Sequence, residues 1–174
     1  MNTIFFVLLS LCAQIMCCQN TTAVFPDDYF GIYSGTLEIH SKHGSQSIPM
    51  EFHFQPTDSV GKYSYTLVYE GDFGRQERAY HLIEQNKERG EYVVDENNGI
   101  ILDDKVLGNR MYALFEVGGS LLTTFITFED DTMIFEIVAS NKNDRRVTFA
   151  DNEDKTEVIS YPISTVQRAV LQKQ

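Results

Sequence analysis

YVVDENNGIILDD, residues Tyr92 to Asp104, is the stretch that decides how this chain folds. Two runs rich in β-branched residues flank Asn97-Asn98-Gly99, which suits a three-residue hairpin loop, a type I turn closed by a glycine in the left-handed region. This loop sets Val94 opposite Leu102 and Tyr92 opposite Asp104. A two-residue loop would mix apolar and charged side chains on both faces, because a slip by one residue moves every side chain across the sheet. The stretch therefore predicts an antiparallel β-hairpin.

The two faces of this hairpin differ in polarity. One face collects Tyr92, Val94, Ile100 and Leu102, and the other carries Val93, Asp95, Ile101 and Asp103. Asp95 and Asp103 become diagonal neighbours, and paired carboxylates can perform acid–base chemistry. Carboxylates on a strand are more often part of a solvated surface. A calcium loop does not fit, because an EF-hand loop with Gly99 in sixth place would begin at Val94, which offers no ligand.

Period-two alternation continues over most of the chain beyond Pro26. In the segment 48–55, Ile, Met and Phe alternate with polar residues, as in a half-buried strand. About ten such segments follow one another at spacings of roughly a dozen residues, with Gly, Asn and Asp turns between them. The last two are RRVTFA (145–150) and TEVISY (156–161). Because closure removes exposed strand edges, we predict an all-β fold, an up-and-down antiparallel β-barrel of about eight to ten strands.

Only the end of the chain predicts a helix. Ser164-Thr165-Val166-Gln167 has the pattern of a capping box, and Ala169 and Val170 extend a narrow apolar stripe after Pro162. We therefore expect a short C-terminal helix over residues 165–172. No linker, repeat or second block of composition interrupts the chain. Residues 29–174 are expected to form one barrel domain, preceded by a tether over residues 19–28.

The N-terminus predicts export. The first 26 residues carry no charged side chain, and Ile4 to Leu11 form an apolar run too short to span a bilayer. Such a run is typical of a secretory leader, here residues 1–18. The segment IMCCQN (15–20) resembles the lipobox of bacterial lipoproteins, which implies lipidation of Cys18; an ordinary cleaved signal is the alternative. We expect a secreted or cell-envelope protein that meets a membrane only through a lipid anchor.

Charge and motifs narrow the function. The net charge of -11 argues against nucleic-acid binding and against adhesion to anionic membranes. All three cysteines lie in the leader, so the expected barrel has no disulfide and no thiol chemistry. No Gly-rich phosphate loop, Cys-x-x-Cys pair or His-Glu-x-x-His segment occurs. The sequence predicts no cofactor.

A family resemblance rests on the first expected strand. FGIYSGTLEI (30–39) resembles the Gly-x-Trp opening of lipocalin-type barrels, with Tyr33 where the tryptophan would stand. Together with RQERAY (75–80), DENNGI (95–100) and MIFEI (133–137), it makes the chain similar to secreted bacterial proteins of a lipocalin-like, calycin-type family. The resemblance implies a lipocalin-like barrel.

One pair of residues suggests a ligand. Fatty-acid-binding barrels hold a ligand carboxylate with an Arg-x-Tyr pair on their last strand, and Arg78-Ala79-Tyr80 has that pattern near the fourth strand. A guanidinium makes two parallel hydrogen bonds to a carboxylate, and a phenol adds a third. The alternative is an exposed arginine paired with an acid. A turn centred near Asp72 sets Tyr65 opposite Ala79 or Tyr80, so we predict a ligand-binding spot formed by Arg78, Tyr80, Tyr63 and Tyr65.

Three hypotheses for function remain open. The four histidines are too dispersed to predict a metal site, and no nucleophile stands beside a base, so no catalytic residue is predicted. The leading hypothesis is a non-catalytic barrel that binds a small hydrophobic or amphipathic ligand, including an anionic one. The second is a structural or partner-binding envelope protein with a solid core. The third is an enzyme that uses Asp95 and Asp103, or Arg78, in a pocket.

Overall fold

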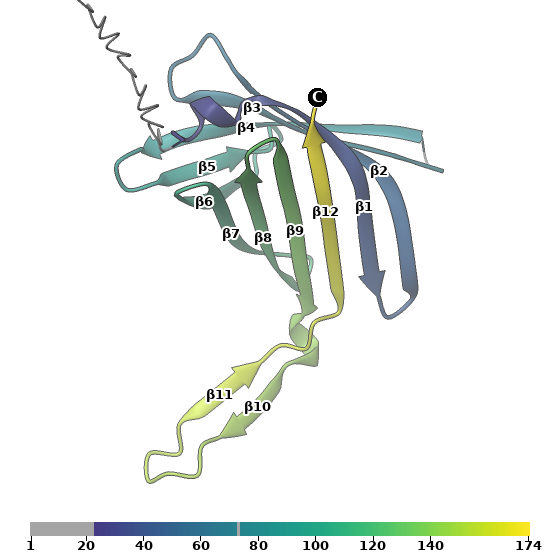
Figure 1. Cartoon of the computed structure of the whole chain (residues 1–174). Helices are drawn as coiled ribbons and strands as arrows, with labels where there is room; N and C mark the ends of the chain where they lie inside the picture. The colour runs from purple at the N-terminus through teal and green to yellow at the C-terminus, as the bar shows by residue number, and fades with distance from the viewer. Residues whose placement is uncertain (1–22, 73) are drawn as a thin grey trace, which may run out of the picture.

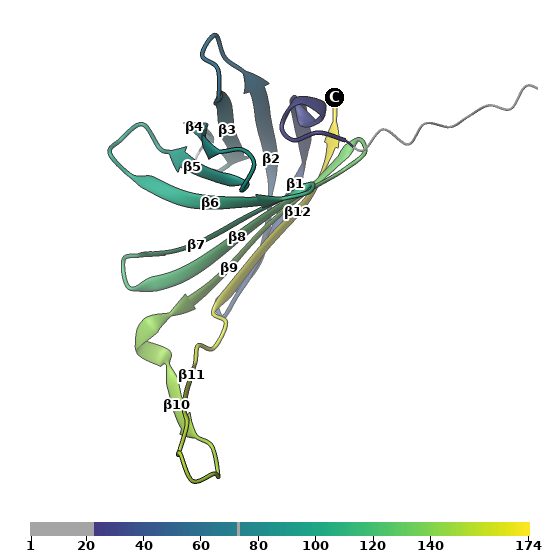
Figure 2. The same cartoon turned by 90° about the vertical axis from the view of Figure 1, so that its left-hand side faces the viewer.

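The computed structural model describes residues 23–72 and 74–174. Ten antiparallel strands close a barrel in the order β1-β12-β9-β8-β7-β6-β5-β4-β3-β2 (Figures 1 and 2). The barrel strands are β1 (Gly31–Ser41), β2 (Gly44–Pro56), β3 (Lys62–Gly71), β4 (Gly74–Asn86), β5 (Glu91–Asp95), β6 (Ile101–Leu107), β7 (Arg110–Val117), β8 (Ser120–Glu129), β9 (Thr132–Asn141) and β12 (Thr165–Lys173). The predicted all-β, up-and-down antiparallel barrel is confirmed. No helix in the described part of the chain has the length and apolarity that crossing a membrane requires.

The hairpin of Tyr92 to Asp104 has the predicted register. Tyr92 lies opposite Asp104 and Val94 opposite Leu102, and the Glu96 N–H donates to the Ile100 carbonyl at 3.0 Å. The loop differs in one respect: Asn97 as well as Gly99 has a positive φ, 57° and 96° respectively. Asparagine tolerates the left-handed region better than most residues, so the loop does not need a second glycine.

The predicted C-terminal helix over 165–172 is wrong, because these residues form strand β12. β12 pairs with β9 on one side and with β1 on the other, and so closes the barrel. Ala169 and Leu171 point into the core, while Val166 and Val170 face outward. The alternation of buried and exposed residues is compatible with a strand, and the capping box with a helix. The segment becomes a strand because β1 and β9 would otherwise keep unpaired edges.

Gly35 allows β12 to lie close against β1. It pairs with Leu171, and a Cβ added at Gly35 would lie only 2.7 Å from the Val170 carbonyl oxygen and 3.0 Å from the Leu171 Cδ2. A larger residue would push the two strands apart at the place where the barrel closes. The glycine in FGIYSGTLEI that follows Tyr33 is therefore required by this contact.

Between β9 and β12 the chain leaves the barrel and forms a separate arm. The arm consists of the 3-10 helix η2 (Lys142–Asp144) and the hairpin of β10 (Arg146–Phe149) and β11 (Glu157–Ser160). These two strands pair only with each other, and Figures 1 and 2 show them projecting away from the barrel. RRVTFA and TEVISY thus contain strands, as predicted, but these strands do not belong to the barrel sheet.

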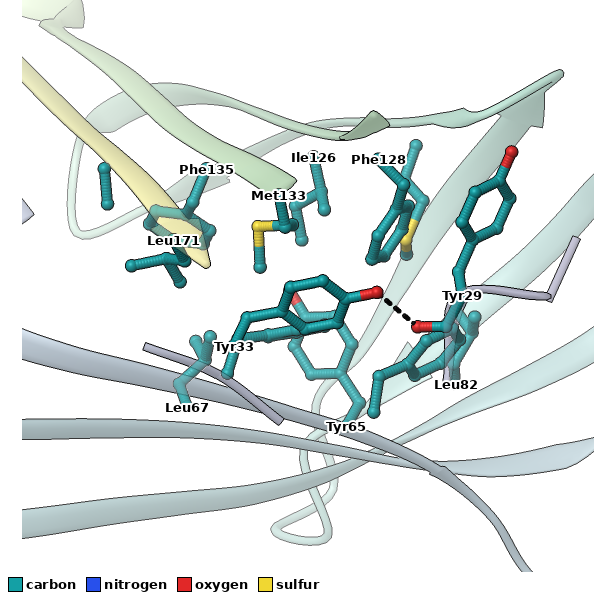
Figure 3. Close-up of a cluster of buried hydrophobic side chains, with 14 of the residues drawn as sticks. Tyr29, Tyr33, Tyr65, Leu67, Leu82, Ile126, Phe128, Met133, Phe135 and Leu171 are labelled. Atoms are coloured by element: carbon teal, nitrogen blue, oxygen red, sulfur yellow. Dashed lines mark hydrogen bonds between the residues drawn. The ribbon is translucent and has the colours of Figure 1, made fainter. Parts of the chain in front are cut away.

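One end of the barrel is sealed by aromatic side chains. The 3-10 helix η1 (Asp27–Tyr29) lies across this end, and Tyr29 stacks on Phe128 with ring centroids 4.9 Å apart. Phe25 is buried beside them and meets Tyr92 edge-on at 5.5 Å. The Tyr33 hydroxyl donates a 2.8 Å hydrogen bond to the Tyr29 carbonyl (Figure 3). We call this cluster the aromatic plug.

The aromatic plug corrects the expectation for residues 19–28. The described part of that segment, residues 23–28, is not a free tether, since Phe25 is buried and Asp27 begins η1. Leader residues 1–18, including Cys18, lie outside the described residues, so secretion and lipidation stay predictions.

Candidate ligand site at the open end of the barrel

The end opposite the aromatic plug is hollow. A cavity of about 690 Å³ lies there, between the inward faces of nine of the barrel strands. Its apolar walls are Leu37, Ile39, Ile48, Leu122, Phe115 and Ile137. Three glutamines, Gln46, Gln76 and Gln167, also line it. The cavity is therefore an apolar chamber with additional polar groups.

A smaller pocket of about 110 Å³ adjoins this cavity. The two share lining residues, including Tyr69, Leu102 and Phe115, so they are parts of one hollow. The smaller pocket is additionally lined by Tyr65, Leu67 and Phe135, which belong to the buried core. It is thus the deep end of the chamber, and the core residues that separate it from the aromatic plug form its floor.

Several polar groups of the chamber lie together on the wall formed by β3 and β4. Arg78 and Tyr80 on β4 point inward, as the turn at 70–74 predicted, with Tyr65 directly opposite Tyr80. The Tyr65 and Tyr80 rings stack with centroids 6.0 Å apart. Glu96, beyond the end of β5, lines the same wall. Burial raises the pKa of Tyr80, and the Glu96 carboxylate adds to the rise, so the phenol stays a hydrogen-bond donor at neutral pH.

Arg78 stands at the rim of the chamber and remains exposed to solvent. Its guanidinium lies 5.4 Å from the centroid of the Tyr69 ring, a cation–π distance. Within residues 23–72 and 74–174 it forms no ion pair with a carboxylate. Arg75, three positions earlier, points outward and binds Glu51 and Glu77 instead. The inward arginine is therefore the one with donors free for a ligand.

Asp104 is a carboxyl group of the deep end that sequence reasoning did not select. It lines the smaller pocket, and its Oδ1 accepts a 3.2 Å hydrogen bond from the Tyr112 N–H. Burial raises the pKa of Asp104 from 3.8 to about 7, because the charged form loses its hydration there, while the hydrogen bonds from Tyr112 and Lys105 oppose the rise. The signal was present: the predicted register already placed Asp104 opposite Tyr92, on the apolar face.

The structure brings together three of the four residues predicted to bind a ligand. Arg78, Tyr80 and Tyr65 lie along one wall of the chamber. Tyr63 does not join them, because it pairs with Leu82 and packs its ring against Phe30 at 5.7 Å, near the sealed end. Tyr63 and Tyr65 are only two residues apart on β3, yet Tyr65 lines the chamber and Tyr63 lies near the sealed end.

Asp95 and Asp103 lie on the outer face of the barrel. Asp95 pairs with His81 and Ile101, which also face outward, and its Oδ1 accepts the Asn97 N–H at 2.8 Å. Asp103 is exposed. Asp95 therefore caps the hairpin loop, and neither residue can act on a ligand inside the chamber.

Three of the histidines hydrogen-bond to different neighbours and do not converge on one point. His40 bonds the Ser45 hydroxyl at 2.7 Å, His53 the Glu51 carboxylate at 2.7 Å, and His81 the Asn97 side chain at 2.9 Å. In the part of the chain that the structure describes, no group of three or more histidine, cysteine, aspartate or glutamate side chains is arranged to hold a metal ion.

The chain is thus a lipocalin-like, ten-stranded barrel that is solid at one end and hollow at the other. No family model matches the sequence, and no curated protein matches it. Among solved structures it is similar to the S-type phycobiliprotein lyase CPES from Guillardia theta, with a TM-score of 0.57 and 6% identity over 85% of this chain and 89% of that one. At this identity the likeness shows a shared fold alone. The lipocalin-like fold implied by FGIYSGTLEI is confirmed, and membership of the secreted bacterial family stays a prediction.

Proposed function

We propose that this protein binds one small, partly apolar ligand with an anionic group in the chamber, and that it catalyses no reaction. The observation that carries the proposal is the cavity of about 690 Å³ at the open end. Ligand pockets enclose roughly 300–1,000 Å³ and combine apolar walls with a few polar groups. A barrel with a solid core throughout, as the structural hypothesis required, would have no such space.

The polar wall suggests how the ligand lies. Arg78 offers charge-assisted hydrogen bonds at the rim, and the neutral phenol of Tyr80 stands two residues further in on the same strand. The apolar part of the ligand would then occupy the space between Leu37, Ile48 and Ile137. Glu96 on the same wall disfavours a second negative charge. This arrangement favours a monoanionic amphipath, such as an acyl or isoprenoid acid, over a polyanion.

The likeness to a phycobiliprotein lyase supports the proposal only as far as the fold goes. The barrel of that enzyme has the same architecture, and a barrel of this kind is a frequent container for small molecules. The identity of the ligand does not follow from the likeness.

The test compares an acid with its uncharged analogue. We expect cis-parinaric acid to bind with a fluorescence increase, and Arg78→Ala to weaken its affinity by roughly 1.5–3 kcal/mol, the typical value of a charge-assisted hydrogen bond. Binding of the methyl ester should change much less. Arg75→Ala is the matched control, because it removes an arginine from the outer face of the same strand. Equal losses for Arg78→Ala and Arg75→Ala, or for acid and ester, would contradict the role of Arg78.

We also propose that the protein acts outside the cytoplasm, anchored through a lipid on Cys18. The support is the uncharged N-terminal segment with its apolar run and the lipobox-like IMCCQN. One lipidated cysteine that carries two acyl chains, with a third on its amine, anchors firmly. Mature protein should then partition into detergent, and Cys18→Ser should release it into the aqueous phase. Intact mass showing an unmodified N-terminus would leave simple secretion.

A further inference from the structure

The barrel wall is split between β6 and β7. These strands pair only from Asp104 opposite Ala113 to Leu107 opposite Arg110, four residue pairs, fewer than any other neighbouring pair of barrel strands. Residues 101–103 of β6 and 114–117 of β7 have no partner across this boundary, although each is paired on its other side. Figure 2 shows the two strands diverging toward the open end.

Asp104 marks the inner end of the split. Asp104 and Ala113 form the last pair before the strands separate, and the Asp104 carboxylate accepts a 3.2 Å hydrogen bond from the Tyr112 N–H of the facing strand. A side chain that bonds a backbone N–H competes with the regular bonds between strands. Asp104 therefore stands where the pairing of β6 and β7 ends.

Two apolar side chains are exposed on the outer edges of the split. Ile101 on β6 is 55% exposed and Leu114 on β7 is 65% exposed, and the acidic side chains of Asp103 and Glu116 lie beside them. Surface strands normally carry polar side chains on their outward positions. The rim of the open end is more polar, with Gln46, Gln76 and Gln167 beside Arg78.

The split leads into the chamber. Leu102 on one edge and Phe115 on the other line both the main cavity and its deep end. The opposite end of the barrel is closed by the aromatic plug. The split thus connects the surface at Leu114 with the chamber at Leu102 and Phe115.

We propose that the split between β6 and β7 is the lateral gate through which the apolar part of the ligand passes into and out of the chamber. The gate rests on the proposed ligand-binding function. The anionic head of the ligand stays at the polar rim near Arg78, in water, while the tail moves sideways between two strand edges. A tail longer than the chamber can extend outward over Ile101 and Leu114, so the gate selects extended acyl or isoprenoid chains over compact ring systems.

The experiment closes the gate reversibly. Continuing the register past Asp104 and Ala113 sets Ile101 opposite Glu116. Ile101→Cys and Glu116→Cys are combined in a full chain whose Cys12, Cys17 and Cys18 are replaced by serine, so that no other thiol is present. The control carries Thr123→Cys and Val138→Cys, a pair already aligned on the outer face of β8 and β9.

In stopped-flow fluorescence we expect the oxidised gate variant to bind and to release cis-parinaric acid at least about tenfold more slowly than the reduced protein. The dissociation constant should change little, because a gate alters the rates and not the bound state. Reduction should restore both rates, and the control should not respond to oxidation. An unchanged rate in protein shown by mass to be cross-linked would overturn the gate and assign access to the open rim. Absence of binding in the reduced protein would instead overturn the proposed function.

A second variant covers the case in which the disulfide does not close. A bulky polyethylene-glycol maleimide on a single Leu114→Cys should slow association, whereas the same label on Thr36→Cys, an exposed position of β1 away from the split, should not. Equal rates for both labelled proteins would contradict the gate.

Discussion

The two ends of the barrel are built from the same ten strands, yet one is solid and the other hollow. At the sealed end the inward positions hold large side chains such as Phe54, Phe128 and Leu171. At the open end the inward positions hold aliphatic and polar side chains such as Ile39 and Gln167 together with rings such as Phe115, and these leave a cavity between them. About eight strands make a barrel that its own side chains just fill. Ten strands leave a wider interior, so the sealed end needs an additional segment, Phe25 to Tyr29, and the end without one stays open.

The largest expected effect is the loss of an aromatic ring from the plug. Phe128 is fully buried and packs against Tyr29, Phe54 and Tyr33. Phe128→Ala should lower the free energy of unfolding by about 3–5 kcal/mol, because it leaves a cavity in a close-packed cluster. Phe115→Ala, at the hollow end, should cost only about 1 kcal/mol, since its ring already borders empty space. Urea unfolding measures both, and similar values would contradict the contrast between the two ends.

The next effect depends on pH. The pKa of Asp104 is about 7 in the folded protein against 3.8 for a free carboxyl group. Well below pH 4 the group is protonated in both states and contributes nothing; between about pH 4 and 7 the unfolded chain ionises while the folded chamber keeps the neutral acid, so stability falls across this window and stays lower above it. The wild type should therefore lose stability over this window relative to Asp104→Asn, by roughly 2–4 kcal/mol at pH 8. Parallel stability curves for the two proteins between these pH values would show that Asp104 ionises normally.

A smaller effect is expected from one hydroxyl group. Tyr33→Phe removes the hydrogen bond to the Tyr29 carbonyl that joins β1 to η1. It should cost about 0.5–1.5 kcal/mol, the net value of a buried hydrogen bond. Burial also raises the pKa of Tyr33 to about 12, so its phenol stays largely protonated in a spectrophotometric titration to pH 11. Tyr69→Phe, for which the described residues offer no hydrogen-bond partner, is the control and should be close to neutral.

The smallest effect should follow removal of the arm. Residues 142–161 can be replaced by a short glycine–serine linker, because Ser140 and Ser164 hold the two ends together through the Pro162 and Ala139 carbonyls. Stability should change by about 0.5 kcal/mol or less, as for other surface changes. A large loss of stability would mean that the folding of the barrel depends on the arm as well as on the packing at its two ends.

Sequence reasoning reached the barrel because alternation and turn residues are local signals. The register of Tyr92 with Asp104 followed from a single turn, and a second turn narrowed the partner of Tyr65 to Ala79 or Tyr80, of which the structure has Tyr80. The prediction from sequence failed at residues 165–172, where two distant strand edges decide the conformation. It also failed at Phe25, because the burial of this ring depends on the width of the finished barrel. Arg78 and Tyr80 were found through a pattern of two residues. Tyr63 was misjudged because the period-two pattern gives the face on which a side chain lies and not its depth along the barrel axis, whereas Asp104 was overlooked although the predicted register placed it on the apolar face.

The barrel can close only after strand β12 has been synthesised. The last strand pairs with the first, and the Gln174 side chain reaches the Ser34 hydroxyl across 140 positions of sequence. Until that strand leaves the ribosome, β1 and β9 keep unpaired edges, and the nascent chain is an open sheet able to pair with its neighbours. Contacts so distant in sequence also form slowly. A premature stop codon before Thr165 would fix the chain in that state, so messages truncated even slightly should yield aggregates rather than a shortened barrel.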